Sequence, residues 1–216
     1  MMYYSASMNT LDESLMNAVK EGKLLESSRT NIRLLLDGTE SPIAREAVEE
    51  LAAAGEWQEL NDRFYKTLAF GTGGLRGRTI GSIVTRAEQG NGGVNGRPEY
   101  PCVGTACMNY FNVGRAMRGL IIYVNKHVEA TDPGRKPRLV IGHDTRHFSR
   151  DFAEFCAKIG TDLGCDIYLF DSPRATPEIS FAIRELHADS GVVLTASHNP
   201  SHDNGFKAYF NHGAQL

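Results

Sequence analysis

A serine next to a histidine stands near the C-terminal end of the chain, directly after an apolar run. The run is residues 191–195, and the segment that follows it reads Ala196-Ser197-His198-Asn199-Pro200. A serine hydroxyl becomes a nucleophile when a base takes its proton, and His198 and the later Lys207 are candidates for that base. The alternative is a polar turn without chemistry, because turns favour the same residue types.

A second candidate segment is rich in glycine and ends on an arginine. Residues 70–77 read Phe-Gly-Thr-Gly-Gly-Leu-Arg-Gly. Glycines such as Gly73 and Gly74 let backbone approach an anion closely, and the guanidinium of Arg76 can hold two oxygens at once. Position 76 is Arg where a dinucleotide-binding fingerprint requires Gly. The segment is therefore either an anion-binding loop or a glycine-rich connector.

A third segment, residues 142–146, contains Asp144 and Arg146. Arg146 is a candidate for binding phosphate, and the alternative is a structural ion pair with Asp144. The spacing of His198 and His202 occurs in metal sites, but Pro200 interrupts any helix that would bring these two side chains together. We therefore expect no zinc site made by this chain alone.

The elements that position these segments alternate between helix and strand. Apolar runs predict strands at 138–142, 165–170 and 191–195, and periodic apolar residues predict helices at 105–128, 149–163 and 177–186. Short buried strands that alternate with helices indicate βαβ units in a sheet covered on both faces. In such a sheet the loops at the carboxyl ends of the strands bind ligands. The segments after residues 142, 170 and 195 are therefore expected at one edge.

The N-terminal third of the chain has only helical patterns. Helices are predicted at 11–21, where Thr10 and Glu13 form a capping-box pattern, at 41–54 and at 56–69. We therefore divide the chain into a helical extension, residues 1–69, and an α/β domain, residues 70–216. The predicted fold class is α/β, a three-layer sandwich with a mostly parallel mixed sheet that follows the helical extension.

Composition excludes several classes of protein. The net charge of -3 arises from intermixed signs, which argues against a nucleic-acid partner. No apolar stretch approaches the length of a membrane span, and no signal peptide is recognisable, so we expect a cytoplasmic protein without a membrane partner. The four cysteines lack CxxC spacing and are expected to be reduced core thiols.

The three segments together resemble the α-D-phosphohexomutases, the phosphoglucomutases and phosphomannomutases. The resemblance rests on Thr195–Pro200 followed by Asp-Asn-Gly-Phe-Lys at 203–207, on Gly-Thr-x-Gly-x-Arg-Gly at 71–77, and on Gly-x-Asp-x-Arg at 142–146. The helical residues before Phe70 resemble the longer members, which include phosphoglucomutase-2-like enzymes and phosphopentomutases. His143 stands where the family commonly has arginine.

The resemblance implies an isomerase of carbohydrate metabolism in which Ser197 carries a phosphoryl group. The group moves between C1 and C6 of a hexose phosphate through a 1,6-bisphosphate of the sugar. The residues that match the family's catalytic and phosphate-binding motifs are Ser197, His198, Lys207, Arg76, Thr72, Gly73, Gly74, Arg146 and Asn199. The choice of general base between His198 and Lys207 stays open. The implied cofactors are Mg²⁺ and an activator such as glucose 1,6-bisphosphate.

The resemblance covers only the first of the family's four domains. The phosphate on Ser197 is the one Mg²⁺ ligand that this chain is expected to supply, because the family's Asp-x-Asp-x-x-Arg metal loop has no match here. We therefore expect an incomplete, truncated domain I that is inactive as a mutase in isolation. The alternatives are a non-catalytic phosphosugar-binding or regulatory module, a serine phosphohydrolase, and a pentose phosphate as substrate.

Overall fold

The computed structural model describes residues 4–71 and 74–216, with side chains from residue 10 onward. The chain forms two compact units. One consists of the N-terminal residues up to Leu68 together with Ile80–Cys107, and the other consists of Ala69–Thr79 together with Met108–Leu216. From the sequence we divide the chain after residue 69 into a helical extension and an α/β domain, and this division into domains stays a proposal. Within the described residues, no helix combines the length and the apolar character needed to cross a membrane.

The first unit is helical. Its elements are α1 (Tyr4–Lys20), α2 (Glu26–Asp37), α3 (Pro42–Ala53), α4 (Trp57–Phe64), α5 (Arg86–Gln89) and the short 3₁₀ turn η1 (Val94–Gly96). Apolar residues that recur at steps of three or four are fully buried, among them Ile32 with Leu35 and Leu60 with Phe64. Pro42 stands at the first position of α3, where its missing N–H is not needed.

Several predicted helix boundaries in this part of the chain are wrong. Helix α1 continues through Thr10, which is therefore not a cap, and α2 was not predicted. Helix α4 ends at Phe64 instead of residue 69, and the helix predicted from residue 105 begins at Tyr110. The physical reason is long-range pairing between the segment that follows α4 and the segment that precedes Tyr110. Leu68 donates its N–H to the carbonyl of Thr105, and the Thr105 hydroxyl donates to the carbonyl of Lys66.

The second unit is a mixed α/β sheet of five strands. They are β1 (Leu75–Arg78), β2 (Arg138–His143), β3 (Asp166–Leu169), β4 (Ser190–Leu194) and β5 (Asp203–Phe210), and their spatial order is β1-β5-β4-β2-β3. Strand β2 pairs in parallel with β3 and β4, and β5 pairs antiparallel with β4 and β1. The predicted α/β class with a mixed sheet is confirmed. Strands β1 and β5 were not predicted as strands.

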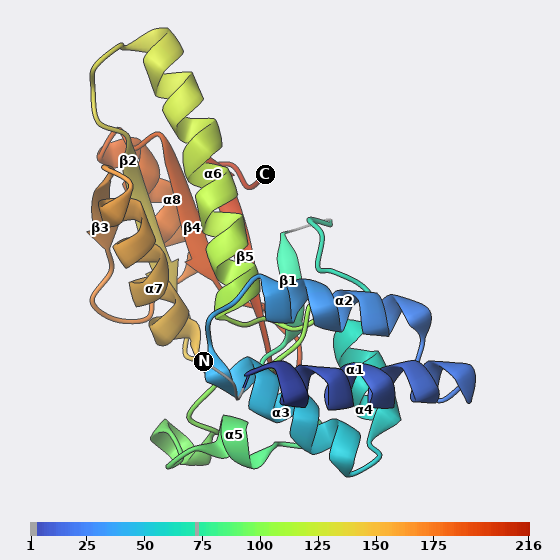
Figure 1. Ribbon diagram of the computed structural model, residues 1–216. Coiled ribbons are helices and arrows are strands. Elements are labelled where there is room, and N and C mark those ends of the chain that lie inside the picture. The colour runs from blue at the N-terminus through green and yellow to red at the C-terminus, as the bar shows by residue number, and fades with distance from the viewer. Residues whose placement is uncertain (1–3, 72–73) are drawn as a thin grey trace. The chain divides into compact units, whose positions relative to one another are not determined.

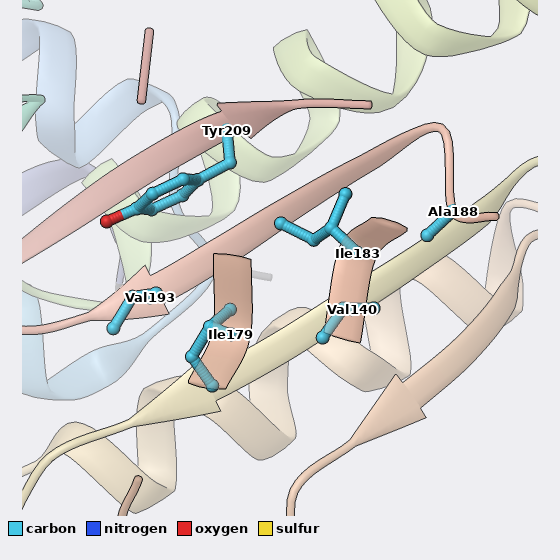
Figure 2. Packing of buried hydrophobic residues seen from close by; sticks show 6 residues of the cluster. All are labelled: Val140, Ile179, Ile183, Ala188, Val193 and Tyr209. Carbon is cyan, nitrogen blue, oxygen red and sulfur yellow. The ribbon is translucent and has the colours of Figure 1, made fainter. Parts of the chain in front are cut away.

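Helices cover both faces of this sheet (Figure 1). Helices α6 (Tyr110–Thr131) and α7 (Ser149–Asp162) lie on one face, and α8 (Thr176–Glu185) lies on the other. Figure 2 shows the packing under α8, where its Ile179 and Ile183 contact Val140 of β2, Val193 of β4 and Tyr209 of β5. Because side chains alternate along a strand, Leu139 and Ile141 face α7 instead. This arrangement is the predicted three-layer sandwich.

Two glycines let α8 approach the sheet closely. A Cβ at Gly142 of β2 would lie 2.3 Å from the Cδ1 of Ile179, and one at Gly191 of β4 would lie 2.4 Å from the Cδ1 of Ile183. Both contacts are shorter than carbon atoms tolerate, so the isoleucines occupy the space that a side chain would fill. The four cysteines are free and buried, as predicted.

Candidate active site

The loop after β4 presents Ser197 in an unusual backbone conformation. Ser197 is exposed and has a φ of 58°, in the left-handed region that residues other than glycine rarely adopt. This conformation costs about 1–2 kcal/mol for a residue with a Cβ. Its N–H donates to the Oγ1 of Thr195 at 2.9 Å, and its carbonyl accepts from Arg146 at 2.8 Å. Strain that is held in place from both sides is typical of functional positions.

Asp144 joins this loop to the loop after β2. Its Oδ2 accepts a hydrogen bond from the Thr195 hydroxyl at 2.5 Å, and its Oδ1 accepts from the Ser149 hydroxyl at 2.6 Å and from the Arg146 N–H at 2.9 Å. Strands β2 and β4 are parallel neighbours, so their carboxyl ends meet at one edge of the sheet. The predicted convergence of these two loops is therefore present. The linking role of Thr195 was missed, although both residues follow predicted strands.

Arg146 lies against the Ser197 loop. Its Nε is 3.4 Å from the Oδ2 of Asp144, so the ion pair that we gave as the alternative is present. The rest of its guanidinium donates to backbone carbonyls of the Ser197 loop. The loop after β3 reaches the same edge, where Arg174 donates its N–H to the carbonyl of His143.

Arg76 and Lys207 share one face of the sheet. Arg76 of β1 lies opposite Gly205 of β5, and a Cβ at Gly205 would be only 3.3 Å from the Cγ of Arg76. The Arg76 side chain therefore lies over the face toward which residue 205 points. Lys207 is two residues further along β5 and points to that same face, the face covered by α8. The unpredicted antiparallel strand thus brings Lys207 and Arg76 together.

Within the described part of the chain, neither of these two cations is close enough to a carboxylate to form an ion pair with it. Among the described residues, the buried Nε of Arg76 has no hydrogen-bond partner, and neither Arg76 nor Lys207 forms an ion pair. Lys207 is 9% exposed, and burial together with the neighbouring charge of Arg76 lowers its pKa, which Asp144 partly opposes. A buried donor without a partner needs an explanation, and an anionic ligand supplies one.

The other predicted site residues have more local surroundings. His198 is exposed, and the amide of Asn199 donates to the Oδ2 of Asp203 at 3.0 Å, which closes the loop. A Cβ at Gly74 would lie 2.2 Å from the carbonyl oxygen of Phe206, so β5 itself requires glycine there. The predicted site residues Thr72 and Gly73 lie outside the described residues.

The described side chains do not form a magnesium site. Within the described ranges, no group of three or more His, Cys, Asp or Glu side chains is placed to hold a metal ion. Mg²⁺ in proteins usually needs several oxygen ligands, and an isolated serine phosphate would supply part of that set. We therefore assign no step of the chemistry below to a metal.

Comparison with known protein families decides what this site belongs to. Residues 86–216 match the model of phosphoglucomutase/phosphomannomutase, alpha/beta/alpha domain I. The chain belongs to the phosphoglucomutase/phosphomannomutase family. The match includes the Ser197 loop, Arg146 and Lys207, and it confirms the family that the sequence motifs resemble.

Individual phosphoglucomutases of this family align with most of the chain. A phosphoglucomutase of Staphylococcus epidermidis ATCC 12228 is 36% identical over 159 residues, which are 74% of this chain and 24% of that protein. One of Staphylococcus aureus USA300 is 34% identical over 158 residues, or 73% of this chain and 24% of that protein. The chain spans about a quarter of the length of these relatives. A crystal structure provisionally named a phosphomannomutase, from Thermus thermophilus, aligns with 70% of this chain and 27% of its own, at 26% identity and a TM-score of 0.49.

Proposed function

We propose that this chain is the phosphoserine-bearing domain of a phosphosugar mutase that moves a phosphoryl group between C1 and C6 of a hexose phosphate. The observation that carries the proposal is the surroundings of Ser197. Its backbone is held in a left-handed turn at the carboxyl edge of the sheet, and the same sheet presents Arg76 and Lys207, two cations that lack a carboxylate partner among the described residues.

The reaction that we propose conserves the phosphoryl group. Phosphorylated Ser197 donates it to a free hydroxyl of the sugar phosphate, so the bond between phosphorus and the serine Oγ breaks as a bond to the sugar oxygen forms. The proton of that hydroxyl passes to a base, and the product is a sugar 1,6-bisphosphate. After the sugar turns, its other phosphate returns to Ser197. Arg76 would stabilise the negative charge of the moving group.

Lys207 is the base that the geometry favours over His198. A lysine accepts a proton only in its neutral form, and both burial and the charge of Arg76 lower the pKa of Lys207. His198 is exposed, so water competes with any substrate for its ring. We propose that Lys207 takes the proton of the attacking sugar hydroxyl and passes it to the departing serine oxygen in the same step. In the second transfer Lys207 takes the proton of the Ser197 hydroxyl and passes it to the released sugar oxygen.

The rest of the activity is proposed for the protein as a whole. The substrate is a hexose phosphate, with a pentose phosphate as the alternative, and a sugar bisphosphate such as glucose 1,6-bisphosphate loads Ser197. We propose that Mg²⁺ binds the phosphate on Ser197 and oxygens supplied outside the described side chains. The isolated chain is expected to lack mutase turnover. A cytoplasmic location without nucleic-acid or membrane partners completes the proposal.

Transfer of phosphate from glucose 1,6-bisphosphate to the chain tests the function. The purified chain is incubated with the bisphosphate and Mg²⁺, and its intact mass and peptide map are measured before and after. We expect one added phosphate, located on Ser197 and absent from Ser197→Ala.

The matched control is Ser201→Ala, which removes another exposed hydroxyl from the same loop. It should be phosphorylated like the wild type. Phosphate on Ser201 or elsewhere contradicts the role of Ser197. Binding of the bisphosphate without any transfer favours the alternative, a phosphosugar-binding module.

A further inference from the structure

Arg146 directs its guanidinium at a ring of backbone carbonyls. The two Nη1 hydrogen bonds measure 2.6 and 3.1 Å and the two Nη2 bonds 2.8 and 2.5 Å, and the acceptors are the carbonyls of Pro200, Asp203, Ser197 and Asn199 in that order. The Nε lies 3.4 Å from the carboxylate of Asp144, and the side chain is only 12% exposed. Four hydrogen bonds from the two Nη atoms and the ion pair of the Nε therefore engage the guanidinium within the protein.

The Ser197 loop depends on this cation for its curvature. Four carbonyl dipoles that converge on one point repel each other unless a positive group lies at that point. One of the four carbonyls belongs to Ser197, the residue with the left-handed backbone. Removal of the guanidinium would leave these oxygens facing one another and would favour relaxation of the serine to an ordinary conformation.

We propose that Arg146 is a positioning residue, which holds residues 197–203 in the conformation that presents Ser197 and does not itself bind phosphate. The proposal rests on the role of Ser197 as phosphoryl carrier. A phosphate could reach Arg146 only by displacing carbonyls that it already binds. Arg76, by contrast, has a buried donor without a partner among the described residues. Positioning and phosphate binding are thus assigned to different arginines.

Amide hydrogen exchange of the loop tests the proposal in the unphosphorylated chain. The N–H of Asn199 donates to the carbonyl of Ala196 at 3.1 Å, and that of Asp203 to the carbonyl of Pro200 at 3.0 Å. We expect exchange at these amides to become at least tenfold faster in Arg146→Met. Arg146→Lys should give an intermediate value, because an ammonium can replace some of the four bonds, and it supplies the comparison if Arg146→Met does not fold.

Arg150→Met is the matched control. The Nη1 of Arg150 donates to the carbonyls of Phe170 and Asp171 at 3.0 and 2.9 Å, so it makes the same type of contact with the neighbouring loop. This variant should accelerate exchange at residues 170–174 and leave 197–203 unchanged. Wild-type exchange at 197–203 in folded Arg146→Met or Arg146→Lys would overturn the proposal.

Two further measurements separate positioning from phosphate binding. The accelerated exchange of Arg146→Met should persist in a Ser197→Ala background, which carries no phosphate; an effect confined to phosphorylated protein would overturn the proposal. In the phosphorylation assay, Arg146→Lys should lower the maximal rate at least threefold and change the half-saturating bisphosphate concentration less than twofold. A raised half-saturating concentration would indicate direct contact with phosphate. If Ser197 is never phosphorylated, the proposed function fails while the exchange result still stands.

Discussion

Two arginines, one in each unit of the chain, have opposite surroundings. Arg63 at the end of α4 is 1% exposed, and its Nε and Nη1 donate to Glu59 and Glu88 at 2.8 and 2.5 Å. Its remaining donors reach the carbonyls of Ile83 and Val103. Glu88 in turn caps α5 through Thr85. The charge is therefore fully paired inside the helical unit.

Among the residues that the structure describes, Arg76 has no comparable set of partners. Its buried Nε lacks an acceptor within the described part of the chain, and its charged neighbour is another cation, Lys207. Burial alone therefore does not reveal what an arginine does. Paired donors stabilise the fold, as in Arg63, whereas an unpaired donor beside a second cation is available to an anionic ligand. Arg146 resembles Arg63 because its donors have partners within the protein, although it lies beside the Ser197 loop.

The largest expected effect is on stability, in the helical unit. Arg63→Met removes the partner of two buried carboxylates, Glu59 and Glu88, and should lower the free energy of unfolding by about 3–5 kcal/mol. Urea unfolding followed by the fluorescence of Trp57, the chain's single tryptophan, measures this unit.

Arg86→Met is the control for this prediction. The side chain of Arg86 is 93% exposed and lies 3.7 Å from Glu50, so its loss should change the free energy of unfolding by less than about 0.5 kcal/mol. Equal stability of the two variants would remove the basis for treating Arg63 as a structural cation.

In contrast to Arg63→Met, the Arg76→Met substitution should affect ligand binding strongly and stability little. Removal of a cation whose buried Nε has no partner among the described residues should change the free energy of unfolding by less than about 0.5 kcal/mol. The affinity for glucose 1,6-bisphosphate should fall by about 1.5–3 kcal/mol, or roughly 10–150-fold, because a charged donor to phosphate is lost. Calorimetric titration of the folded variant measures the affinity.

Arg138→Met controls for the loss of one positive charge from the same sheet. Arg138 begins β2, at the edge opposite the Ser197 loop, so the affinity should stay within twofold of the wild type. If Arg76→Met binds the bisphosphate as tightly as Arg138→Met, the unpaired donor does not serve a ligand.

The sequence predicts what depends on local patterns. The apolar runs of β2, β3 and β4, and the polar segments that follow them, are recognisable without knowledge of any neighbour. Strand β5 is not, because it opens with Asp203, Asn204 and Gly205, residues typical of turns. It becomes a strand because β4 and β1 flank it on both sides. Tertiary pairing here overrides local preference.

In the candidate site, too, contacts between residues that are distant in the sequence could not be predicted from local patterns. The motif identifies Ser197, but the acceptors of Arg146 lie 51–57 residues away in the sequence, so their contacts with Arg146 depend on the fold. The sequence leaves phosphate binding and an ion pair as equal alternatives for Arg146. Only the placement of its donors distinguishes them. Likewise, Gly74 suggests an approach to phosphate, whereas the structure shows an approach to the backbone of Phe206.

The smallest expected effect is a shift in the pH dependence of the rate of Ser197 phosphorylation, and it tests whether Arg76 influences the neighbouring Lys207. Burial and the charge of Arg76 lower the pKa of Lys207 from its ordinary value of 10.5. If neutral Lys207 is the base, the rate of Ser197 phosphorylation rises with pH as Lys207 loses its proton. Arg76→Met removes a neighbouring positive charge, so the pKa of Lys207 should rise and the ascending limb should move to higher pH.

The titration of the Lys207 side chain by ¹³C NMR checks the sign of this shift without reference to any rate. Its midpoint should lie below the ordinary lysine value in the wild type and closer to that value in Arg76→Met. Arg138→Met, at the opposite edge of the sheet, should leave the midpoint unchanged, because solvent and salt screen a distant charge. If the pH dependence of the phosphorylation rate is unchanged in Arg76→Met but is lost in His198→Gln, the proton transfer belongs to His198 instead.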